Sequence, residues 1–433
     1  MPLKTSTAYA LIEKLWLKNR NFCSEDYDDC LDYFLKILPF EIHSYSESYN
    51  SWEIPPKWDL VRADIFFKGK CVYQVDHPLK IIGLSMPFKG KLSKEALQKH
   101  LHFDHRYSDA IPYHFRQFYR PWERDWGFCV PKDFYDTLEE GEYTVHIETR
   151  ESLGTLKVAE YTIEGESPEC FTFVAHLDHP GMANDDLAGV AVGVELFERL
   201  SKVKTKFSYK LVLLPEIIGS EFYLAKTVQN KELFLGACFL EMLGSKTPLA
   251  LQFSLNEDSK IETKLQETLK KYSKPYNEGP FKSIICNDEA VWQSHGIPMC
   301  SLSRFPYPEY HSSRDNLSII DQNSLDEAVE VLYQAIASLE ALTLIEKKFE
   351  GTPCTSHPDL NLYVDPGQRA FGSHATSNVL KLRLLMDLLP AQKRFFYLED
   401  LASETDLSKE VVFTYLKQWE AKGLLKIKGW SDL

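Results

Sequence analysis

Polar side chains crowd the stretch that directly follows the apolar run 171–174, a predicted buried strand. Residues 175–189 read AHLDHPGMANDDLAG and contain two histidines, three aspartates and an asparagine. An imidazole followed two residues later by a carboxylate is typical of a metal-bound histidine that an acid orients, which makes His176 a candidate ligand and Asp178 its partner. Asp185 follows in a turn before an apolar helix, where an aspartate can also serve only as the helix cap. This stretch alone leaves a metal site and an ordinary capped loop as alternatives.

Three later positions repeat this chemistry at predicted strand ends and in a loop. Glu216 follows the apolar run 209–214, and Glu241 closes the next apolar run along the chain. His311 lies in a loop rich in proline and tyrosine, with Asp315 four residues later. An ionised carboxylate at the edge of a buried strand is costly unless an opposite charge pairs with it, and a metal ion would do so. Each position alone also fits an ordinary loop residue, so the signal is their joint order.

The segments that must position these residues alternate between strand and helix. The predicted strands are 170–175, 209–214 and 237–242, and the predicted helices are 189–200, 220–228, 260–271 and 324–346. This alternation predicts an α/β fold with a mostly parallel, mixed sheet flanked by helices, whose carboxyl strand ends hold the site. Short β-like runs between turns at 58–163 predict an inserted small β-rich domain.

In chain order, these residues resemble the motifs of the dinuclear zinc aminopeptidase family, which also includes glutamate carboxypeptidase and glutaminyl cyclase relatives. The resemblance rests on His176-x-Asp178, on residues 184–189 (NDDLAG), on Glu216 with Gly219-Ser220, on Glu241 and on His311. Residues 287–298 (NDEAVWQSHGIP) resemble the family's segment that ends in Gly-Ile-Pro ahead of its last histidine. The resemblance covers roughly residues 165–345 and the N-terminal helices. The whole layout is similar to a bacterial branch with an aminopeptidase-like domain, often near polysaccharide biosynthesis genes.

The resemblance implies one or two zinc ions as the cofactor. It implies that Asp185 bridges two ions, with His176 and Glu241 completing one and Glu216 and His311 completing the other. Imidazole and carboxylate groups are zinc ligands, and a shared carboxylate suits two metals about 3.5–4 Å apart. A water bound there would supply hydroxide near neutral pH for attack on a carbonyl.

The third motif departs from the family. The family usually has two adjacent glutamates, a general base followed by a ligand, whereas this chain has Pro215 before Glu216. Either Glu216 is the base and its zinc is under-liganded or absent, or Glu216 is the ligand and the base is another residue, with Glu221 and Glu289 as candidates. Glu241 also stands where the family usually has aspartate, a difference of one methylene.

The predicted function is that of a zinc-dependent hydrolase of the aminopeptidase type, acting on a small peptide or amide. Pro215 keeps a second interpretation open, in which the same fold has a mono-zinc or non-peptidase role. That role would be acyl transfer, cyclisation or sugar-amide hydrolysis in surface polysaccharide biosynthesis. A third interpretation is a regulator whose enzyme-like domain senses a ligand for a winged helix.

Candidate substrate-binding residues come from the segment 108–131, which is rich in aromatic residues and arginine. Such segments are common in ligand pockets, where they supply rigid area and bidentate donors. We therefore expect Tyr113, Arg116 and Arg120 to contact substrate, with Arg304 as a further donor to a carboxylate or sugar acid. The alternative is that the segment only anchors the insertion to the main domain.

The sequence predicts three folded parts and a linker. The zinc aminopeptidase-like catalytic domain comprises 1–57 and 164–348, around the inserted β-rich domain 58–163. Residues 349–377 are a predicted linker, and 378–433 resemble a winged helix-turn-helix domain.

The charge of the chain argues against nucleic acid and anionic membranes as partners. There are 63 acidic against 49 basic residues, a net charge of −14. In the predicted recognition helix, Lys409, Lys417 and Lys422 are offset by Glu410 and Glu420. We therefore expect an interaction module, one that could form a homo-oligomer, rather than a DNA-binding module.

Cysteine usage predicts a reducing compartment. The nine cysteines are scattered, with no Cys-x-x-Cys pair, which fits reduced thiols. No apolar run reaches the roughly 18 residues that span a bilayer. We therefore expect a cytoplasmic protein without a membrane segment.

Overall fold

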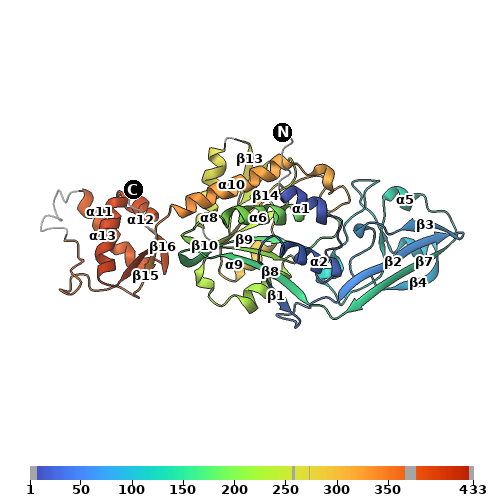
Figure 1. Ribbon diagram of the computed structural model, residues 1–433, viewed down its shortest axis with the longest axis horizontal. Helices are drawn as coiled ribbons and strands as arrows, with labels where there is room; N and C mark the ends of the chain where they lie inside the picture. Colours follow the sequence, from blue (N-terminus) through green and yellow to red (C-terminus); the bar gives the residue numbers. More distant parts are fainter. Residues whose placement is uncertain (1–6, 256–258, 273, 366–376, 429–433) are drawn as a thin grey trace. The chain divides into compact units, whose positions relative to one another are not determined.

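The computed structural model describes residues 7–255, 259–272, 274–365 and 377–428 (Figure 1). The chain divides into two compact units, Met1–Ile336 and Ala337–Leu433. Within the described ranges, no helix is both long and apolar enough to cross a membrane. All the candidate metal ligands lie in the first unit.

An eight-stranded mixed sheet forms the centre of the first unit, in the order β1-β8-β10-β9-β11-β14-β12-β13. Strands β10, β9, β11 and β14 are parallel neighbours, whereas β8 and β12 run antiparallel to β10 and β14. The strands are β1 (Glu41–Tyr45), β8 (Leu156–Ile163), β9 (Ser167–His176), β10 (Phe207–Leu214), β11 (Phe234–Glu241), β12 (Leu249–Gln252), β13 (Tyr276–Gly279) and β14 (Met299–Ser303). The predicted α/β class with a large mixed sheet is confirmed.

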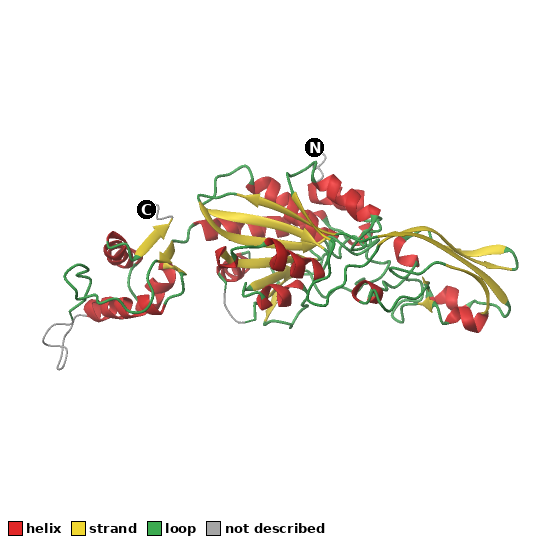
Figure 2. Cartoon of the chain, turned by 90° about the horizontal axis from the view of Figure 1, so that it is seen from below, coloured by secondary structure: helices red, strands yellow, loops and turns green. Residues whose placement is uncertain are grey.

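Helices cover both faces of this sheet (Figures 1 and 2). Successive side chains of a strand point to opposite faces, so Phe173 of β9 packs on Phe197 of α6 while Val174 joins a cluster that contains Trp292 of α9. The helical elements are α1 (Thr7–Leu15), α2 (Glu25–Phe34), α6 (Leu187–Leu200), α7 (Ile218–Phe222), η2 (Tyr223–Thr227), η3 (Lys231–Leu233), α8 (Lys260–Lys271), α9 (Asp288–Ser294), η4 (Leu317–Ile319) and α10 (Gln322–Glu340). The sheet is therefore buried on both sides, as its apolar central strands require.

The polar stretch after β9 leads directly into α6. Asp186 is the N-cap of this helix, and its Oδ1 accepts a hydrogen bond from Gly189 N at 3.2 Å. A Cβ atom at Gly189 would stand 2.3 Å from Leu240 O of β11, so the helix start approaches the strand closely only because residue 189 is glycine. This close approach keeps the polar stretch against the ends of β9 and β11.

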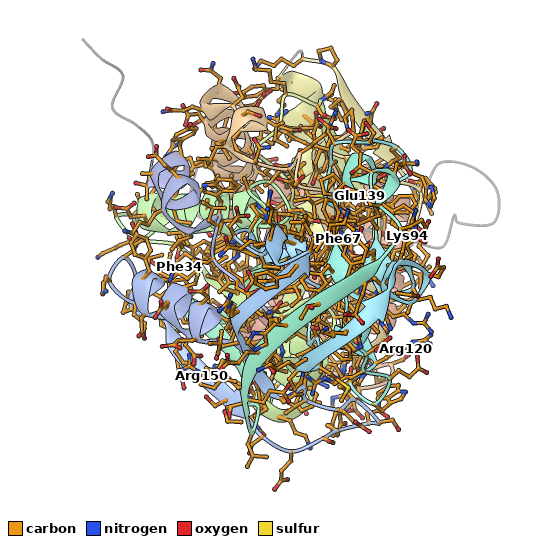
Figure 3. All side chains as sticks on the ribbon, turned by 90° about the vertical axis from the view of Figure 1, so that its right-hand side faces the viewer. Phe34, Phe67, Lys94, Arg120, Glu139 and Arg150 are labelled. Carbon is orange, nitrogen blue, oxygen red and sulfur yellow. The ribbon has the colours of Figure 1, made fainter. Side chains whose placement is uncertain are left out.

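The region between β1 and β8 contains a four-stranded antiparallel sheet in the order β3-β2-β7-β4. Figure 3 looks onto it, with Phe67 and Arg150 near its opposite ends. Its elements and those beside it are β2 (Lys57–Phe67), β3 (Lys70–Gln74), η1 (Pro78–Lys80), β4 (Phe88–Ser93), α3 (Lys94–Gln98), β5 (Leu101–His102), α4 (Arg116–Tyr119), β6 (Phe128–Cys129), α5 (Lys132–Asp136) and β7 (Glu142–Ser152). The sequence-based expectation of β-rich structure here agrees with these strands.

Strand β8 differs from the expectation that residues 155–163 belong to the β-rich region. It pairs antiparallel with β1 on one side and with β10 on the other, and Val158 and Ala159 are fully buried. An apolar strand pattern identifies a strand but not the sheet that it joins. The large sheet thus draws one strand from before the β-rich region and one from after it.

The described part of the second unit contains a three-stranded antiparallel sheet, β16-β15-β17, with α-helices and one 3-10 helix. Its elements are β15 (Leu344–Lys347), α11 (Ser377–Leu388), η5 (Leu389–Ala391), β16 (Phe395–Tyr397), α12 (Leu398–Thr405), α13 (Lys409–Ala421) and β17 (Leu425–Lys428). Part of the predicted linker, 366–376, lies outside the described residues, whereas Leu362 is buried and its O accepts a hydrogen bond from Tyr415 Oη. The winged helix-turn-helix stays a prediction.

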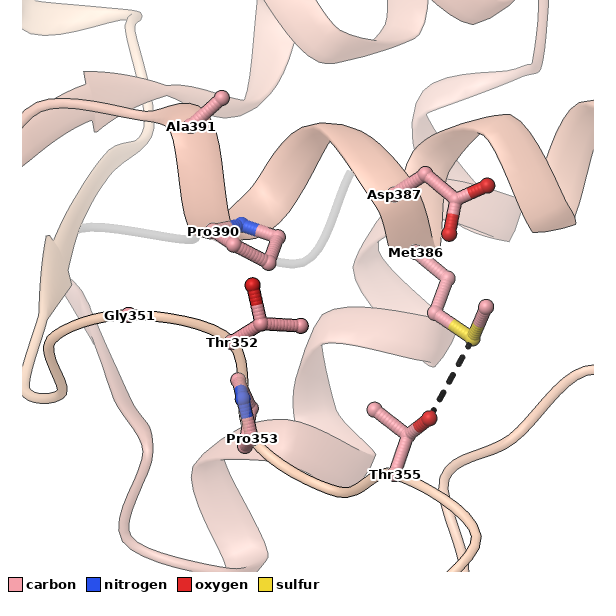
Figure 4. A pocket seen from close by; sticks show the side chains of 8 residues that line it. All are labelled: Gly351, Thr352, Pro353, Thr355, Met386, Asp387, Pro390 and Ala391. Carbon is pink, nitrogen blue, oxygen red and sulfur yellow. Dashed lines mark hydrogen bonds between the residues drawn. The ribbon is translucent and has the colours of Figure 1, made fainter.

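A pocket of about 500 Å³ lies within this second unit (Figure 4). Thr355 on one side of it donates a hydrogen bond to Met386 Sδ at 3.7 Å. Asp387 is the only ionisable side chain among its lining residues, so the pocket holds no pair of groups for acid–base or metal chemistry. It is lined by Gly351, Thr352, Pro353, Thr355, Met386, Asp387, Pro390 and Ala391.

A fully buried guanidinium ties the N-terminal helices to the polar stretch. Arg20 donates hydrogen bonds to Leu177 O at 3.0 Å and to Met182 O at 2.9 Å, on either side of residues 178–181. It also donates to Leu15 O at 2.9 Å, at the end of α1. The guanidinium of Arg20 therefore fixes the loop that carries Asp178, because it bonds a carbonyl on each side of that loop.

We expect Arg20→Met to lower the free energy of unfolding by about 3 kcal/mol, because the two loop carbonyls lose a charged donor and stay buried. Urea unfolding of the full chain measures this loss. The control is Arg150→Met, whose side chain is 69% exposed, and it should cost less than about 0.5 kcal/mol. Equal stability of the two variants would contradict the role given to Arg20.

Candidate metal centre

The candidate ligands meet at one edge of the large sheet because they follow parallel neighbouring strands. His176 is the last residue of β9 and pairs with Leu214, the last residue of β10, two residues before Glu216. Glu241 is the last residue of β11, the neighbour of β9 on the other side. Ligands in α/β sheets bind at such carboxyl ends.

The carboxylate of Asp185 lies between three imidazoles. Its Oδ1 is 3.3 Å from His176 Nε2 and 3.2 Å from His179 Nδ1, and its Oδ2 is 3.2 Å from His311 Nε2. Asp185, His176 and His179 are at most 3% exposed. The sequence left His179 without a role, and the structure places it in the centre of the group.

Burial and the surrounding charges shift the pKa values of Asp185 and His179 in opposite directions. Burial raises the pKa of Asp185, but the imidazoles of His179, His176 and His311 hold it well below its usual value. Burial lowers the pKa of His179, while Asp185 and Asp178 raise it to about 10. A proton on the His179 imidazole thus offsets the carboxylate charge where a bound cation would otherwise do so.

Asp178 faces the ring nitrogens of His176 and His179 that point away from Asp185. Its Oδ1 is 3.4 Å from His176 Nδ1, and its Oδ2 is 3.6 Å from His179 Nε2. Asp178 Oδ1 also accepts a hydrogen bond from Glu216 N at 2.8 Å. One carboxylate therefore contacts the far side of both rings and holds the backbone that carries Glu216.

Asp315 fixes the backbone of the loop that carries Asp185. Asp315 accepts hydrogen bonds from Ala183 N at 3.0 Å, Asn184 N at 2.6 Å and Asp185 N at 3.1 Å, and Tyr307 Oη donates to it at 2.6 Å. Burial, and then the charge of Asp185, raise the pKa of Asp315 to about 7. The sequence pointed to Asp315 only as a neighbour of His311, because a bond across about 130 residues leaves no local pattern.

Asp186 ties the strand ends to the start of α6. Its Oδ2 accepts a hydrogen bond from His176 N at 3.2 Å, and its Oδ1 accepts one from Met242 N at 2.7 Å as well as from Gly189 N. The carboxylate is completely buried, and burial raises its pKa well above the usual value. Asp186 therefore connects β9, α6 and the residue after β11.

Glu241 is 1% exposed, and Asn287 Nδ2 donates a hydrogen bond to its Oε1 at 2.5 Å. Burial, and then the nearby Glu289, raise its pKa well above the usual value. Glu289 itself accepts hydrogen bonds from Asn287 N at 2.8 Å and Gln252 Nε2 at 3.1 Å. Among the described residues, Glu289 makes no hydrogen bond to the group around Asp185.

Glu216 faces the cluster from the end of β10. Its Oε2 lies 3.6 Å from His179 Nε2 and accepts a hydrogen bond from Tyr119 Oη. Burial raises the pKa of Glu216, but His179 and its other polar neighbours lower it to about 2, so it is ionised at neutral pH. Glu221, the other glutamate weighed as a base, instead contacts His295 Nε2 at 2.9 Å and Asn50 Nδ2 at 3.2 Å.

The aromatic segment 108–131 contributes two tyrosines to the site. The ring of Tyr113 is 4.9 Å from that of His179 and 5.2 Å from that of His311, measured between centroids. Tyr119 contacts Glu216 through its hydroxyl, a role for which the sequence offered no separate signal. The segment thus contacts the cluster through these two tyrosines, and its role in substrate binding stays a prediction.

The three arginines considered for substrate lie in different surroundings. Arg116 and Arg120 are exposed, and both contact Glu123. Arg304 is 3% exposed, and its guanidinium donates to Leu243 O at 3.2 Å, Thr247 O at 2.7 Å, and Ser324 O and Glu327 at 3.0 Å. All three nitrogens of Arg304 are therefore engaged within the fold, and it presents no free donor fork to a substrate.

The cluster fits a metal ion. Seven buried nitrogen and oxygen atoms in it make no hydrogen bond within the described structure, although charged neighbours lie 3.2–3.6 Å away. Unsatisfied buried atoms are rare in folded proteins. A bound ion would satisfy those that do not lie between the rings and Asp178, and imidazole with carboxylate is a donor set that zinc accepts. The seven atoms are His176 Nδ1 and Nε2, Asp178 Oδ2, His179 Nδ1, Asp185 Oδ2, Glu241 Oε2 and His311 Nε2.

Known proteins share this fold. A Clostridium acetobutylicum protein, provisionally named for polysaccharide biosynthesis and for an aminopeptidase-like domain, is 29% identical over 343 residues, which is 77% of each chain. A crystal structure of a provisionally named peptidase from the same organism superposes with a TM-score of 0.74 at 24% identity, covering 97% of this chain and 96% of that one. A zinc aminopeptidase from Bacillus subtilis gives a TM-score of 0.58 at 12% identity, covering 78% and 96%.

These likenesses show that the fold is that of the zinc aminopeptidases, as the sequence motifs predicted. Residues 9–341 match a single family over most of the chain's length. The protein therefore belongs to the family described as a domain of unknown function, DUF4910.

Proposed function

We propose that the protein is a zinc-dependent hydrolase of the aminopeptidase type, which cleaves a peptide or another small amide. The observation that carries this proposal is the buried group of unsatisfied imidazole and carboxylate atoms around Asp185, at the carboxyl ends of parallel strands. Its fold neighbours include a zinc aminopeptidase, and its relative is named for an aminopeptidase-like domain.

The residues that would hold zinc follow the resemblance. Asp185 would be shared, His176 and Glu241 would complete one ion, and His311 would hold a second, under-liganded ion, because Glu216 is kept as the base. Bound zinc supplies a Lewis acid and an activated water for attack on a carbonyl carbon. Asp178 would orient the ring of His176 from its Nδ1 side.

Proton transfer falls to Glu216 in this arrangement, because Pro215 has no side chain that accepts a proton. Glu216 is ionised and borders the cluster, whereas Glu221 and Glu289 are occupied by hydrogen bonds outside it. Burial, and then the charge of Glu216, raise the pKa of Tyr119 well above its usual value, so the phenol stays protonated and donates to Glu216. Tyr119 thereby positions the carboxylate that would receive a proton from water and deliver it to the leaving amine.

A second candidate function is hydrolysis of an acylated amino sugar. A pocket of about 360 Å³ shares Tyr119 with the cluster and exposes the ring of Trp122. Aromatic faces with adjacent charged groups suit the apolar faces and hydroxyls of a sugar ring. The pocket is lined by Phe22, Asn50, Ser51, Trp52, Glu53, Phe118, Tyr119, Arg120, Trp122 and Ile218.

Asp185→Asn should abolish zinc binding, with affinity falling more than about 100-fold, and should abolish hydrolysis. An amide cannot supply the negative charge that the surrounding imidazoles and the ion require. Elemental analysis of dialysed protein and hydrolysis of aminoacyl anilides measure the two losses. Asp136→Asn, at an exposed carboxylate, is the control. Full zinc occupancy in Asp185→Asn would refute the proposed function.

Trp122→Ala should separate the two substrate classes. If an acylated amino sugar is the substrate, KM for it should rise about tenfold. A tenfold rise corresponds to the loss of roughly 1.4 kcal/mol of contact between the Trp122 ring and the sugar. KM for aminoacyl anilides should change less than twofold. Leu153→Ala, at a 96% exposed apolar residue outside the pocket, is the control. Hydrolysis of anilides alone, by both variants, would leave the peptidase function and remove the sugar substrate.

A further inference from the structure

We propose that His179 is a metal ligand, which forms with His176 and Asp185 a single two-histidine, one-carboxylate site for a divalent ion. The inference rests on the proposed function and changes its ligand set. His179 is absent from the set that the family motifs imply, since those motifs contain the first histidine of the stretch and not the second.

The three donor atoms have the spacing of a zinc site. His176 Nε2 is 3.3 Å and His179 Nδ1 is 3.2 Å from the same oxygen, Asp185 Oδ1. Ligand atoms about 2.0–2.1 Å from a tetrahedral zinc lie about 3.3–3.4 Å from one another. All three donors lie within 4.8 Å of each other.

Both imidazole nitrogens that face Asp185 lack a hydrogen bond. His176 Nε2 and His179 Nδ1 are buried atoms without a partner in the described structure. His179 also has φ +83°, a left-handed conformation that costs a residue other than glycine about 1 kcal/mol or more. The fold therefore keeps a strained, unsatisfied histidine in a position where an ion would satisfy it.

The remaining nitrogens of the two rings face one shared acid. Asp178 Oδ1 is 3.4 Å from His176 Nδ1, and Asp178 Oδ2 is 3.6 Å from His179 Nε2. A carboxylate on the far side of a metal-binding imidazole fixes its orientation and increases its basicity. Here each oxygen of Asp178 serves one ring, so both imidazoles are directed at Asp185 by the same residue.

This ligand set is compatible with proline at position 215, where the family usually has a glutamate. With His179 as the third donor, Glu216 is not needed as a ligand, and its Oε2 lies 3.6 Å from His179 Nε2, the ring nitrogen that does not face Asp185. The single remaining glutamate of the motif can then serve as the proton acceptor. His311 contacts the other oxygen of Asp185, Oδ2, and therefore lies outside the set.

Zinc affinity of single-residue variants tests the assignment, measured on the full chain by competition with a chromophoric chelator. We expect one zinc per chain, a loss of affinity of more than about 100-fold in His179→Gln, and a loss of less than about tenfold in His311→Gln. The matched control is His295→Gln, because His295 is a half-buried histidine that pairs with Glu221 outside the cluster.

Two zinc ions per chain that both persist in His179→Gln, with affinity lost instead in His311→Gln, would overturn this inference and leave the proposed function standing. A wild-type chain that binds no divalent ion would refute the proposed function itself. The two failures are therefore distinguished by the wild-type measurement.

His179→Cys gives a positive readout that loss of folding cannot imitate. A thiolate that replaces a coordinating imidazole should give Co²⁺-loaded protein a sulfur-to-cobalt charge-transfer band, absent from the wild type and from His295→Cys. A Co²⁺ spectrum without that band, in a variant that still binds the ion, would show that residue 179 is not a ligand.

Discussion

The structure depends on one largely buried electrostatic arrangement, a carboxylate surrounded by imidazoles. Charges in such surroundings are tolerated only when they are balanced and held in place. Asp185 lies against His176, His179 and His311, and three further aspartates restrain this group. Asp178 holds two rings, Asp186 joins strand ends to a helix, and Asp315 holds the backbone of Asp185 itself.

Segments that are distant in sequence from His176 and Asp185 surround the Asp185 cluster. The N-terminal segment contributes the guanidinium of Arg20 behind the loop, and the β-rich region contributes Tyr113 and Tyr119 in front of it. A metal site needs such surroundings because excluded water strengthens each electrostatic contact inside it. The β-rich region is thus part of the candidate site as well as a neighbour of the large sheet.

The sequence predicted the parts of the site that follow from strand order. His176, Glu216 and Glu241 end or follow apolar runs, and parallel strands bring such ends together. It did not assign His179 or Tyr119. The left-handed conformation of His179, which sets the direction of its side chain, and a contact that Tyr119 makes across about 100 residues both leave no periodic pattern. Arg304 shows the reverse case, a residue whose type suits substrate and whose donors are engaged by carbonyl groups of the fold.

The bonds from Asp315 to three successive amides have a consequence for the order in which the candidate site forms during synthesis. The loop 183–185 is made early, but its backbone acquires its acceptor only when a segment about 130 residues further along the chain has been made and docked. Closing so long a connection is entropically costly and slow compared with local folding. A nascent chain that already has its central strands therefore still lacks the acceptor that fixes the backbone at Asp185.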